Sequence, residues 1–264
     1  MKNIKVTLLH HTPLYIASDG ARTCWSSQDK SDTSDTIDEK VENYLHFEAL
    51  GEVFNSPEDL VRTSLEATTI GPKDLALIDR VGNQYHHASI LEHITFNFFI
   101  DGISRACLQE LARHRIASLS VKSSRYTISE LRKEQPFTEY TDIDDQEYLP
   151  TGRERAEKYL VMTTDERVNR YSILALDNLR DLVATGMSND LSKYAIPESY
   201  RTQLTWSINM RSLQNFLSLR TDRKALPEIQ HLANLIYETL PTDAQSLVAH
   251  CVSSEIEKQK KNNS

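Results

Sequence analysis

A chain of 264 residues is long enough for one large domain or two small ones and can bury a substantial core. Its net charge of −8 and pI near 5.6 argue against a general nucleic-acid or membrane-surface binder, because such proteins are usually basic overall. No apolar run approaches the roughly 20 residues of a membrane span, and the N-terminus lacks a signal-peptide profile. We therefore expect a soluble, cytoplasmic protein that binds neither nucleic acid nor membranes.

The first third of the chain predicts a strand, a helix and an insertion. Residues 4–9 are mostly apolar and indicate a strand, and Thr12-Pro13 is expected to cap a helix with proline at its first position. From about residue 28 to residue 72 the composition shifts to Ser, Thr, Asp and Glu, and Gly71-Pro72 marks a turn. We interpret 28–72 as an inserted excursion in a single domain that spans residues 1–252.

The middle of the chain predicts a strand followed by a helix. Apolar residues alternate over 94–100, which is typical of a strand, and Asp101-Gly102 is expected to turn the chain. Apolar residues then recur at helical spacing from 103 to 111, so a helix is predicted to run into Arg113. Cys107 lies on the apolar face of this helix, and we expect it in the core.

The rest of the chain is predicted to be mainly helical. Residues 152–185 indicate a charged helix pair or one bent helix, and Trp206, Met210, Leu213 and Leu217 follow a helical period. A last helix is expected from about 223 to 240, and the charged tail 253–264 is expected to be disordered. The three cysteines (Cys24, Cys107, Cys251) lack the spacing of a zinc site or a disulfide framework, which fits a reducing cytoplasm.

A basic, serine-rich run at 113–126 is the strongest chemical signal. It places four cations, one imidazole and four serine hydroxyls within fourteen residues. The macrodipole favours cations at a helix end, so a solvated helix end followed by a polar loop is one interpretation. However, two arginines that flank a histidine repel one another unless an anion is bound, and guanidinium forks suit phosphate oxygens. The run therefore predicts a site for a phosphorylated small molecule, and we expect a nucleotide.

Two further segments carry polar groups at suggestive spacing. His86, His87 and His93 invite a metal hypothesis, but their spacing is not one helical turn and no HExxH order is present, so we expect no metal. A turn and short helix that contact a ligand through Ser89 are favoured instead. Residues 209–220 place amide and guanidinium groups on one helix face. This face could form hydrogen bonds with the edge of a ring or with a phosphate, or it could be an ordinary polar surface.

Together these segments closely resemble the flavin-dependent thymidylate synthases. The family signature, Arg-His-Arg, seven residues and then Ser, is met by 113–123, and the segments 87–93 and 209–220 also match in order and approximate spacing. The resemblance covers roughly residues 5–25 and 78–240. It implies an α+β fold with a central, mostly antiparallel sheet flanked by helices, and a homotetramer whose active sites are built from several subunits. No Rossmann, P-loop or nucleophile-elbow motif is present.

The resemblance implies reductive methylation of dUMP to dTMP without a cysteine nucleophile. Methylenetetrahydrofolate would supply the carbon, and NADPH would reduce the FAD that delivers the hydride. Arg220 would be catalytic, since a permanent cation beside the uracil favours its ionised form. The residues implied to contact FAD are His87, Ser89, Arg113, His114, Arg115, Asn209, Arg211 and Asn215. Those implied to hold dUMP are Glu110, Arg113, Ser123, Ser124, Arg125, Lys193 and Arg220.

Three positions depart from the family pattern. Val121 stands where many members carry an acidic residue, which leaves its role open. Lys193 stands where an arginine is common, so the charge is kept without the bidentate fork. Lys224 replaces a histidine, so one FAD contact is expected to differ. These changes leave the essential groups of the reaction in place.

Two other functions remain as alternatives at the level of the residues. One is a metal-dependent nucleotide phosphohydrolase that uses His86, His87 and His93 with nearby carboxylates. The other is a non-catalytic nucleotide- or RNA-binding protein that uses the arginines of the basic run for phosphates. Bound flavin would separate both from the methyltransferase.

Overall fold

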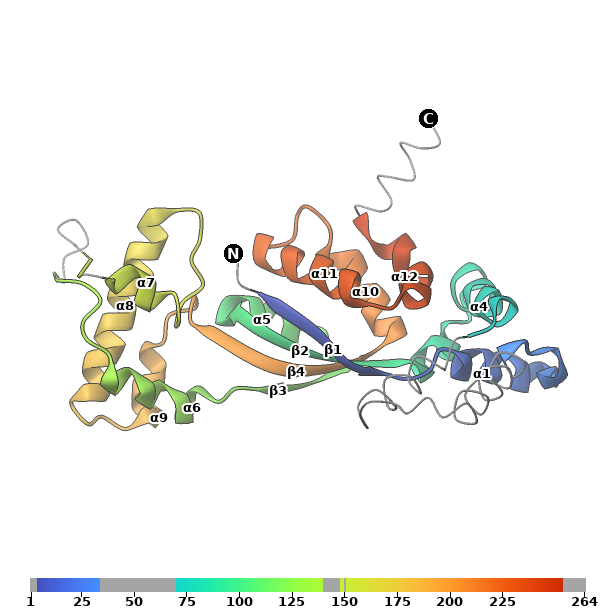
Figure 1. The fold of residues 1–264 in the computed structure, drawn as a ribbon, viewed down its shortest axis with the longest axis horizontal. Coiled ribbons are helices and arrows are strands. Elements are labelled where there is room, and N and C mark those ends of the chain that lie inside the picture. The colour runs from blue at the N-terminus through green and yellow to red at the C-terminus, as the bar shows by residue number, and fades with distance from the viewer. Residues whose placement is uncertain (1–3, 34–69, 140–147, 150, 254–264) are drawn as a thin grey trace, which may run out of the picture. The chain divides into compact units, whose positions relative to one another are not determined.

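A four-stranded sheet organises the chain, for which a computed structural model describes residues 4–33, 70–139, 148–149 and 151–253 (Figure 1). The strands are β1 (Lys5–His11), β2 (Thr95–Ser104), β3 (Ala117–Val121) and β4 (Arg201–Asn209), in the order β1-β2-β4-β3. Backbone hydrogen bonds from Thr12 to Thr95 and from Arg105 to Tyr200 join the end of one strand to the start of its neighbour. Neighbouring strands are therefore antiparallel, and the predicted α+β class is confirmed.

The chain divides into two compact units. One comprises Met1–Leu8, Phe98–Ser207 and Leu219–Thr239, and the other comprises Leu9–Asn97, Ile208–Ser218 and Leu240–Ser264. Divisions between the two units fall within strands β1, β2 and β4 and within helix α10 (Met210–Arg220). Residues 34–69 of the expected insertion and 254–264 of the expected tail lie outside the described residues.

The two central strands, β2 and β4, differ from what the sequence pattern predicts. β2 continues through Asp101-Gly102 to Ser104, so the predicted turn there is wrong; Gly102 has a φ of 90°, which glycine adopts within the strand at little cost. Trp206 belongs to β4 and not to a helix, because alternate residues from Thr202 to Ile208 are buried. The helical period of Trp206 with Met210 was therefore coincidental, and the helix begins at Met210.

Two helices of the first unit, α5 (Arg105–Ala112) and α11 (Pro227–Thr239), pack together on one face of the sheet (Figure 1). The Ser104 hydroxyl caps α5 by accepting from the Cys107 N–H at 3.0 Å. The buried Glu228 carboxylate of α11 accepts from the Ser104 N–H at 2.7 Å and from its hydroxyl. Cys107 is fully buried, as predicted.

The described residues between 124 and 200 of the first unit form a helical body with its own apolar core. Its helices are α6 (Ser124–Thr127), η4 (Ile128–Lys133), α7 (Gly152–Ala156), α8 (Glu166–Ala184), α9 (Asn189–Ser192) and η5 (Lys193–Ala195). The prediction of a helix pair over 152–185 is confirmed. The fully buried members of this core include Ile128, Leu131, Phe137, Ile173, Leu176 and Leu179.

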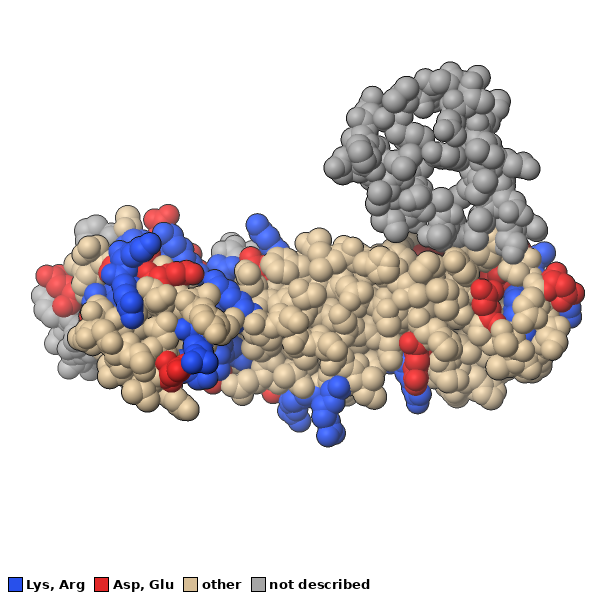
Figure 2. Space-filling model, turned by 90° about the horizontal axis from the view of Figure 1, so that it is seen from below, with Lys and Arg blue, Asp and Glu red and all other residues tan. Residues whose placement is uncertain are grey.

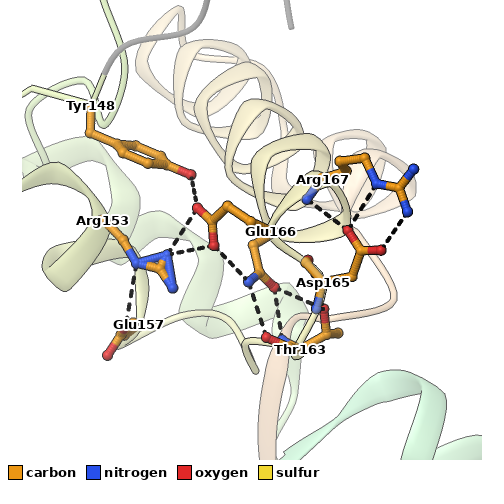
Figure 3. A network of polar contacts seen from close by, with 8 residues as sticks. Tyr148, Arg153, Glu157, Thr163, Asp165, Glu166 and Arg167 are labelled. Carbon is orange, nitrogen blue, oxygen red and sulfur yellow. Dashed lines mark hydrogen bonds and ion pairs between the residues drawn. The ribbon is translucent and has the colours of Figure 1, made fainter.

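A polar network fixes the start of α8 (Figure 3). The Asp165 carboxylate caps the helix by accepting from the Arg167 N–H at 2.9 Å. The Glu166 carboxylate accepts from the Tyr148 hydroxyl at 2.8 Å and from Arg153 of α7 at 3.1 Å. Basic and acidic side chains are accordingly interleaved on the visible face of the helical body (Figure 2).

The second unit contains α1 (Tyr15–Trp25), η1 (Gln28–Lys30), α4 (Pro72–Ile78), the π-helical η2 (Asp79–Gln84), η3 (Ala88–His93), α12 (Thr242–Val248) and η6 (Ala249–Cys251). The predicted cap at Thr12-Pro13 is wrong, because the Thr12 hydroxyl bonds to that of Thr95 at 2.7 Å and α1 begins at Tyr15. The sequence did not predict α12. The side chains of Asn83 and Gln214 hold it by donating to the Leu247 carbonyl.

A buried carboxylate and a helix cap hold residues 31–33 against α4. These two segments lie on either side of residues 34–69 in the sequence. The fully buried Asp74 carboxylate accepts from Arg22 and, at 2.6 Å each, from the hydroxyls of Ser31 and Thr33. Burial alone would raise the pKa of Asp74, but these hydrogen bonds outweigh it and lower the pKa below its ordinary value. The Asp32 carboxylate caps α4 through the backbone N–H groups of residues 73 and 74. The two edges of the expected insertion are therefore fixed to each other.

Candidate functional site

Arg220, at the end of α10, is held by two side chains from the end of α5. Its Nε donates to the His114 Nε2 at 3.0 Å, and its Nη1 donates to the Glu110 carboxylate at 2.8 Å. Its Nη2 donates to the Glu110 carbonyl at 3.2 Å. These bonds use three of the five guanidinium N–H groups, so within the described residues two remain for a ligand. A cation this well held loses little freedom when a ligand binds.

His114 is a neutral acceptor in this cluster. It is buried, and because the Arg220 Nε carries the hydrogen, the His114 Nε2 must be unprotonated and the ring proton must lie on Nδ1. Burial, together with the positive charges of Arg220 and Arg113, lowers the pKa of His114 to about 4, although the Glu110 carboxylate acts in the opposite direction. The imidazole therefore stays neutral at pH 7 and leaves the positive charge on Arg220.

This pKa predicts a pH-dependent stability. Since the folded protein binds the His114 proton less tightly than the unfolded chain does, stability is lost as the pH falls from about 6.5 toward 4. Between pH 7.5 and pH 5 the loss from this group is about 2 kcal/mol. We expect wild type to lose that much more stability than His114→Gln, whose amide oxygen can still accept from Arg220. Urea unfolding of both proteins at the two pH values measures the difference; equal losses would contradict a neutral His114.

A second group of predicted residues lies in the helical body of the same unit. Ser123 precedes α6, and Ser124 and Arg125 lie on it, while Lys193 begins η5 directly after α9. Helix α6 packs against α9, and the Arg125 guanidinium forms an ion pair with Asp190. Ser123, Arg125 and Lys193 are exposed. The structure thus places the residues expected at a phosphate on helices that contact one another through α9.

The third group lies in the second unit. His87 and Ser89 are exposed at the start of η3, and Arg211 and Asn215 are exposed one turn apart on α10. Arg211 forms an ion pair with Glu92 of η3, which joins these two segments. The Asn209 side chain accepts from the Ser212 N–H at 2.8 Å and so helps to begin α10. The segments 87–93 and 209–215 therefore meet, as a shared ligand would require.

The remaining predicted residues, and the departures Val121 and Lys224, lie on loops or at a strand end. Arg113 is exposed and lies 3.5 Å from the Glu110 carboxylate, and Arg115 is exposed before β3. Val121 ends β3 and is 38% exposed, so it remains accessible to a ligand despite its apolar side chain. Lys224 lies in the exposed turn after α10. The pairing acids Glu92 and Asp190 were not singled out from the sequence, which shows a charge but not its partner.

The described residues give no support to a metal centre. They contain no group of three His, Cys, Asp or Glu side chains that could hold a metal ion. His86 has a φ of 59°, so it lies in a left-handed turn before η3, and no metal cluster forms around it within the described chain. Among the described residues, no helix is long and apolar enough to cross a membrane.

Comparisons with known proteins agree with the resemblance. The model of a family described as thymidylate synthase complementing protein matches residues 7–244. A flavin-dependent thymidylate synthase from Wolinella succinogenes is 46% identical over 250 residues, which cover 95% of this chain and 98% of that protein. One from Campylobacter jejuni is 44% identical over 254 residues, covering 96% and 100%.

A solved structure gives the same result for the fold. The crystal structure of Thymidylate Synthase X from Helicobacter pylori with FAD and dUMP matches with a TM-score of 0.75 at 43% identity. The match covers 95% of this chain and 100% of that chain. The chain therefore belongs to the flavin-dependent thymidylate synthases, a family of methyltransferases.

Proposed function

We propose that the chain converts dUMP to dTMP by reductive methylation, with methylenetetrahydrofolate as the carbon donor and NADPH as the reductant of FAD. The single observation that carries this proposal is the cluster of Arg220, Glu110 and His114, which holds a guanidinium in place with two N–H groups left for a ligand. Family membership and the dUMP and FAD of the Helicobacter pylori structure support the choice of ligands.

Arg220 is the catalytic residue in this proposal. A fixed cation beside the uracil stabilises negative charge that develops on the ring, and it does so without reorganisation at the moment of reaction. Glu110 orients the guanidinium through two of its nitrogens, and neutral His114 accepts from the third. Because His114 is neutral, it adds no second positive charge that would repel Arg220. Arg220 is therefore the group in this cluster that polarises the substrate.

The chain carries groups that fit FAD. The accessible guanidiniums suit its pyrophosphate, and the hydroxyl, amide and imidazole groups suit the polar edge of its ring. When bound, FAD supplies hydride transfer, which no side chain can supply. The residues proposed to hold it are His87, Ser89, Arg113, His114, Arg115, Asn209, Arg211 and Asn215.

The dUMP phosphate is proposed to bind Ser123, Ser124, Arg125 and Lys193, with Arg113 as a further contact. The exposed cations Arg125 and Lys193, together with the serine hydroxyls at the start of α6, are suited to a phosphate dianion. We also propose a cytoplasmic homotetramer with active sites built from several subunits, which is what membership of the family implies. Light scattering of the FAD-loaded protein measures the number of subunits.

The purified protein tests the proposal. A yellow preparation, or one that turns yellow with added FAD, should bleach with NADPH and form dTMP from dUMP and methylenetetrahydrofolate. A colourless protein that cannot bind FAD but hydrolyses nucleotides with a divalent metal would overturn the proposal. It would support the histidine-based phosphohydrolase instead.

Cys107→Ala should leave dTMP formation intact. Burial raises the pKa of this thiol, and the Glu228 carboxylate raises it further, so the thiolate that a nucleophile needs is not formed. Loss of its packing in the core lowers stability by on the order of 1 kcal/mol. Turnover and urea unfolding of the variant measure the two effects. A folded Cys107→Ala protein without activity would restore cysteine as a candidate nucleophile.

A further inference from the structure

Asp190 grips the Arg125 guanidinium at two points. Its Oδ1 lies 2.6 Å from the Nε, and its Oδ2 accepts from the Nη2 at 3.0 Å. The adjacent Asn189 side chain donates to the Arg125 carbonyl at 2.8 Å. The Tyr126 ring centroid lies 6.0 Å from the guanidinium carbon. Short helix α9 therefore holds Arg125 by both its backbone and its side chain.

This grip occupies only one edge of the guanidinium. The carboxylate takes the Nε and Nη2 edge, so both Nη1 hydrogens and one Nη2 hydrogen remain, which is the end-on edge that can chelate a second anion. Lys193 follows α9 directly as the first residue of η5, so a second cation comes next in the chain after the helix that orients Arg125. Asp190 can therefore orient the Arg125 guanidinium and still leave its Nη1 and Nη2 edge open to a second anion.

We propose that Asp190 is a positioning residue for the nucleotide phosphate, which it serves by holding Arg125 in a binding-ready orientation with the help of Asn189. The proposal rests on the proposed function, in which Arg125 binds the dUMP phosphate. An unrestrained arginine must lose the freedom of its long side chain when the phosphate binds, whereas a restrained one has already lost it.

The opposing effect is repulsion between Asp190 and the phosphate. Asp190 and Arg125 are more than half exposed, at 57% and 58% of their side chains, so water and salt screen this repulsion. The bond between Asp190 and Arg125 is screened too, but bidentate geometry is the case in which an exposed arginine–carboxylate pair keeps a measurable effect. We therefore expect the restraint to prevail and the carboxylate to favour binding.

The test compares Asp190→Asn with wild type in the FAD-loaded enzyme. The dissociation constant for dUMP should rise about five- to tenfold, while that for deoxyuridine, which lacks the phosphate, should stay unchanged. The KM for dUMP should rise with it, and kcat should change less. Asp190→Glu, which keeps a carboxylate, should recover part of the affinity. In an Arg125→Ala background, Asp190→Asn should have little further effect, because Asp190 acts through Arg125.

Asp181→Asn is the matched control, since Asp181 is an exposed aspartate paired with Arg180 on α8. It should leave dUMP binding unchanged. Tighter or unchanged dUMP binding by Asp190→Asn would overturn the proposal and identify Asp190 as a competitor of the phosphate or as a bystander. An equal loss for dUMP and deoxyuridine would also overturn it, as a structural effect. If wild type formed no dTMP at all, the proposed function would fail instead.

Discussion

Arg220→Ala is expected to reduce dTMP formation at least about a hundredfold, as removal of a fixed donor from a developing negative charge does. FAD should remain bound, because the implied FAD contacts lie mainly on other segments. The side chain is held by Glu110 and His114, whereas Arg113, the other guanidinium at Glu110, is exposed and lies farther from that carboxylate, at 3.5 Å. Turnover with saturating dUMP measures the effect, and flavin absorbance after gel filtration measures FAD retention.

Two further variants serve as comparisons for Arg220→Ala. Arg220→Lys keeps the charge but loses the fork that spans Glu110 and His114, so it should recover only a small part of the activity. Arg153→Ala removes a partly exposed arginine that pairs with Glu166 in the helical body, and it should leave turnover unchanged. Near-normal turnover of Arg220→Ala would show that the role proposed for this residue is wrong.

Asp74→Ala is expected to destabilise the chain by about 3–5 kcal/mol, the usual effect of removing one partner of a buried ion pair. Arg22 would be left as a buried charge without its carboxylate, and the hydroxyls of Ser31 and Thr33 would lose their acceptor. Urea unfolding at pH 7 measures the loss, since the low pKa of Asp74 keeps it ionised there.

Asp29→Ala is the control for Asp74→Ala. Asp29 is an exposed aspartate on η1, close in the chain to residues 31–33, and its removal should change stability by less than about 0.5 kcal/mol. Similar losses for both variants would mean that the buried network around Asp74 does not hold residues 31–33 to α4.

Local patterns predicted the elements whose burial follows a simple period. The alternation from Ile94 to Ile100 marks β2, and the spacing of Cys107 and Leu111 marks α5. The pattern misled where two periods coincide, as at Trp206, and where glycine sits inside a strand, as at Gly102. β3 was missed because its serines belong to the basic run and were interpreted as ligand groups, although Ser118 and Ser120 alternate with Leu119 and Val121.

The candidate site shows a similar division. The resemblance to the family singled out Arg220, His114 and Arg125 one by one, because residue type and order are visible in a sequence. The direction of the Arg220 Nε toward His114, and the grip of Asp190 on Arg125, depend on contacts between residues that lie 106 and 65 positions apart. Such contacts form only once the strands and helices between them have packed. The neutral state of His114 likewise follows from burial, which the sequence does not display.

An anaerobic single turnover tests the central claim most directly. The FAD-loaded protein would be reduced with NADPH, freed of excess NADPH, and mixed with dUMP and methylenetetrahydrofolate in the absence of oxygen. The proposed function predicts that the flavin reoxidises only when both are present and that one dTMP forms for each flavin reoxidised. Persistently reduced flavin with dUMP recovered unchanged would contradict it.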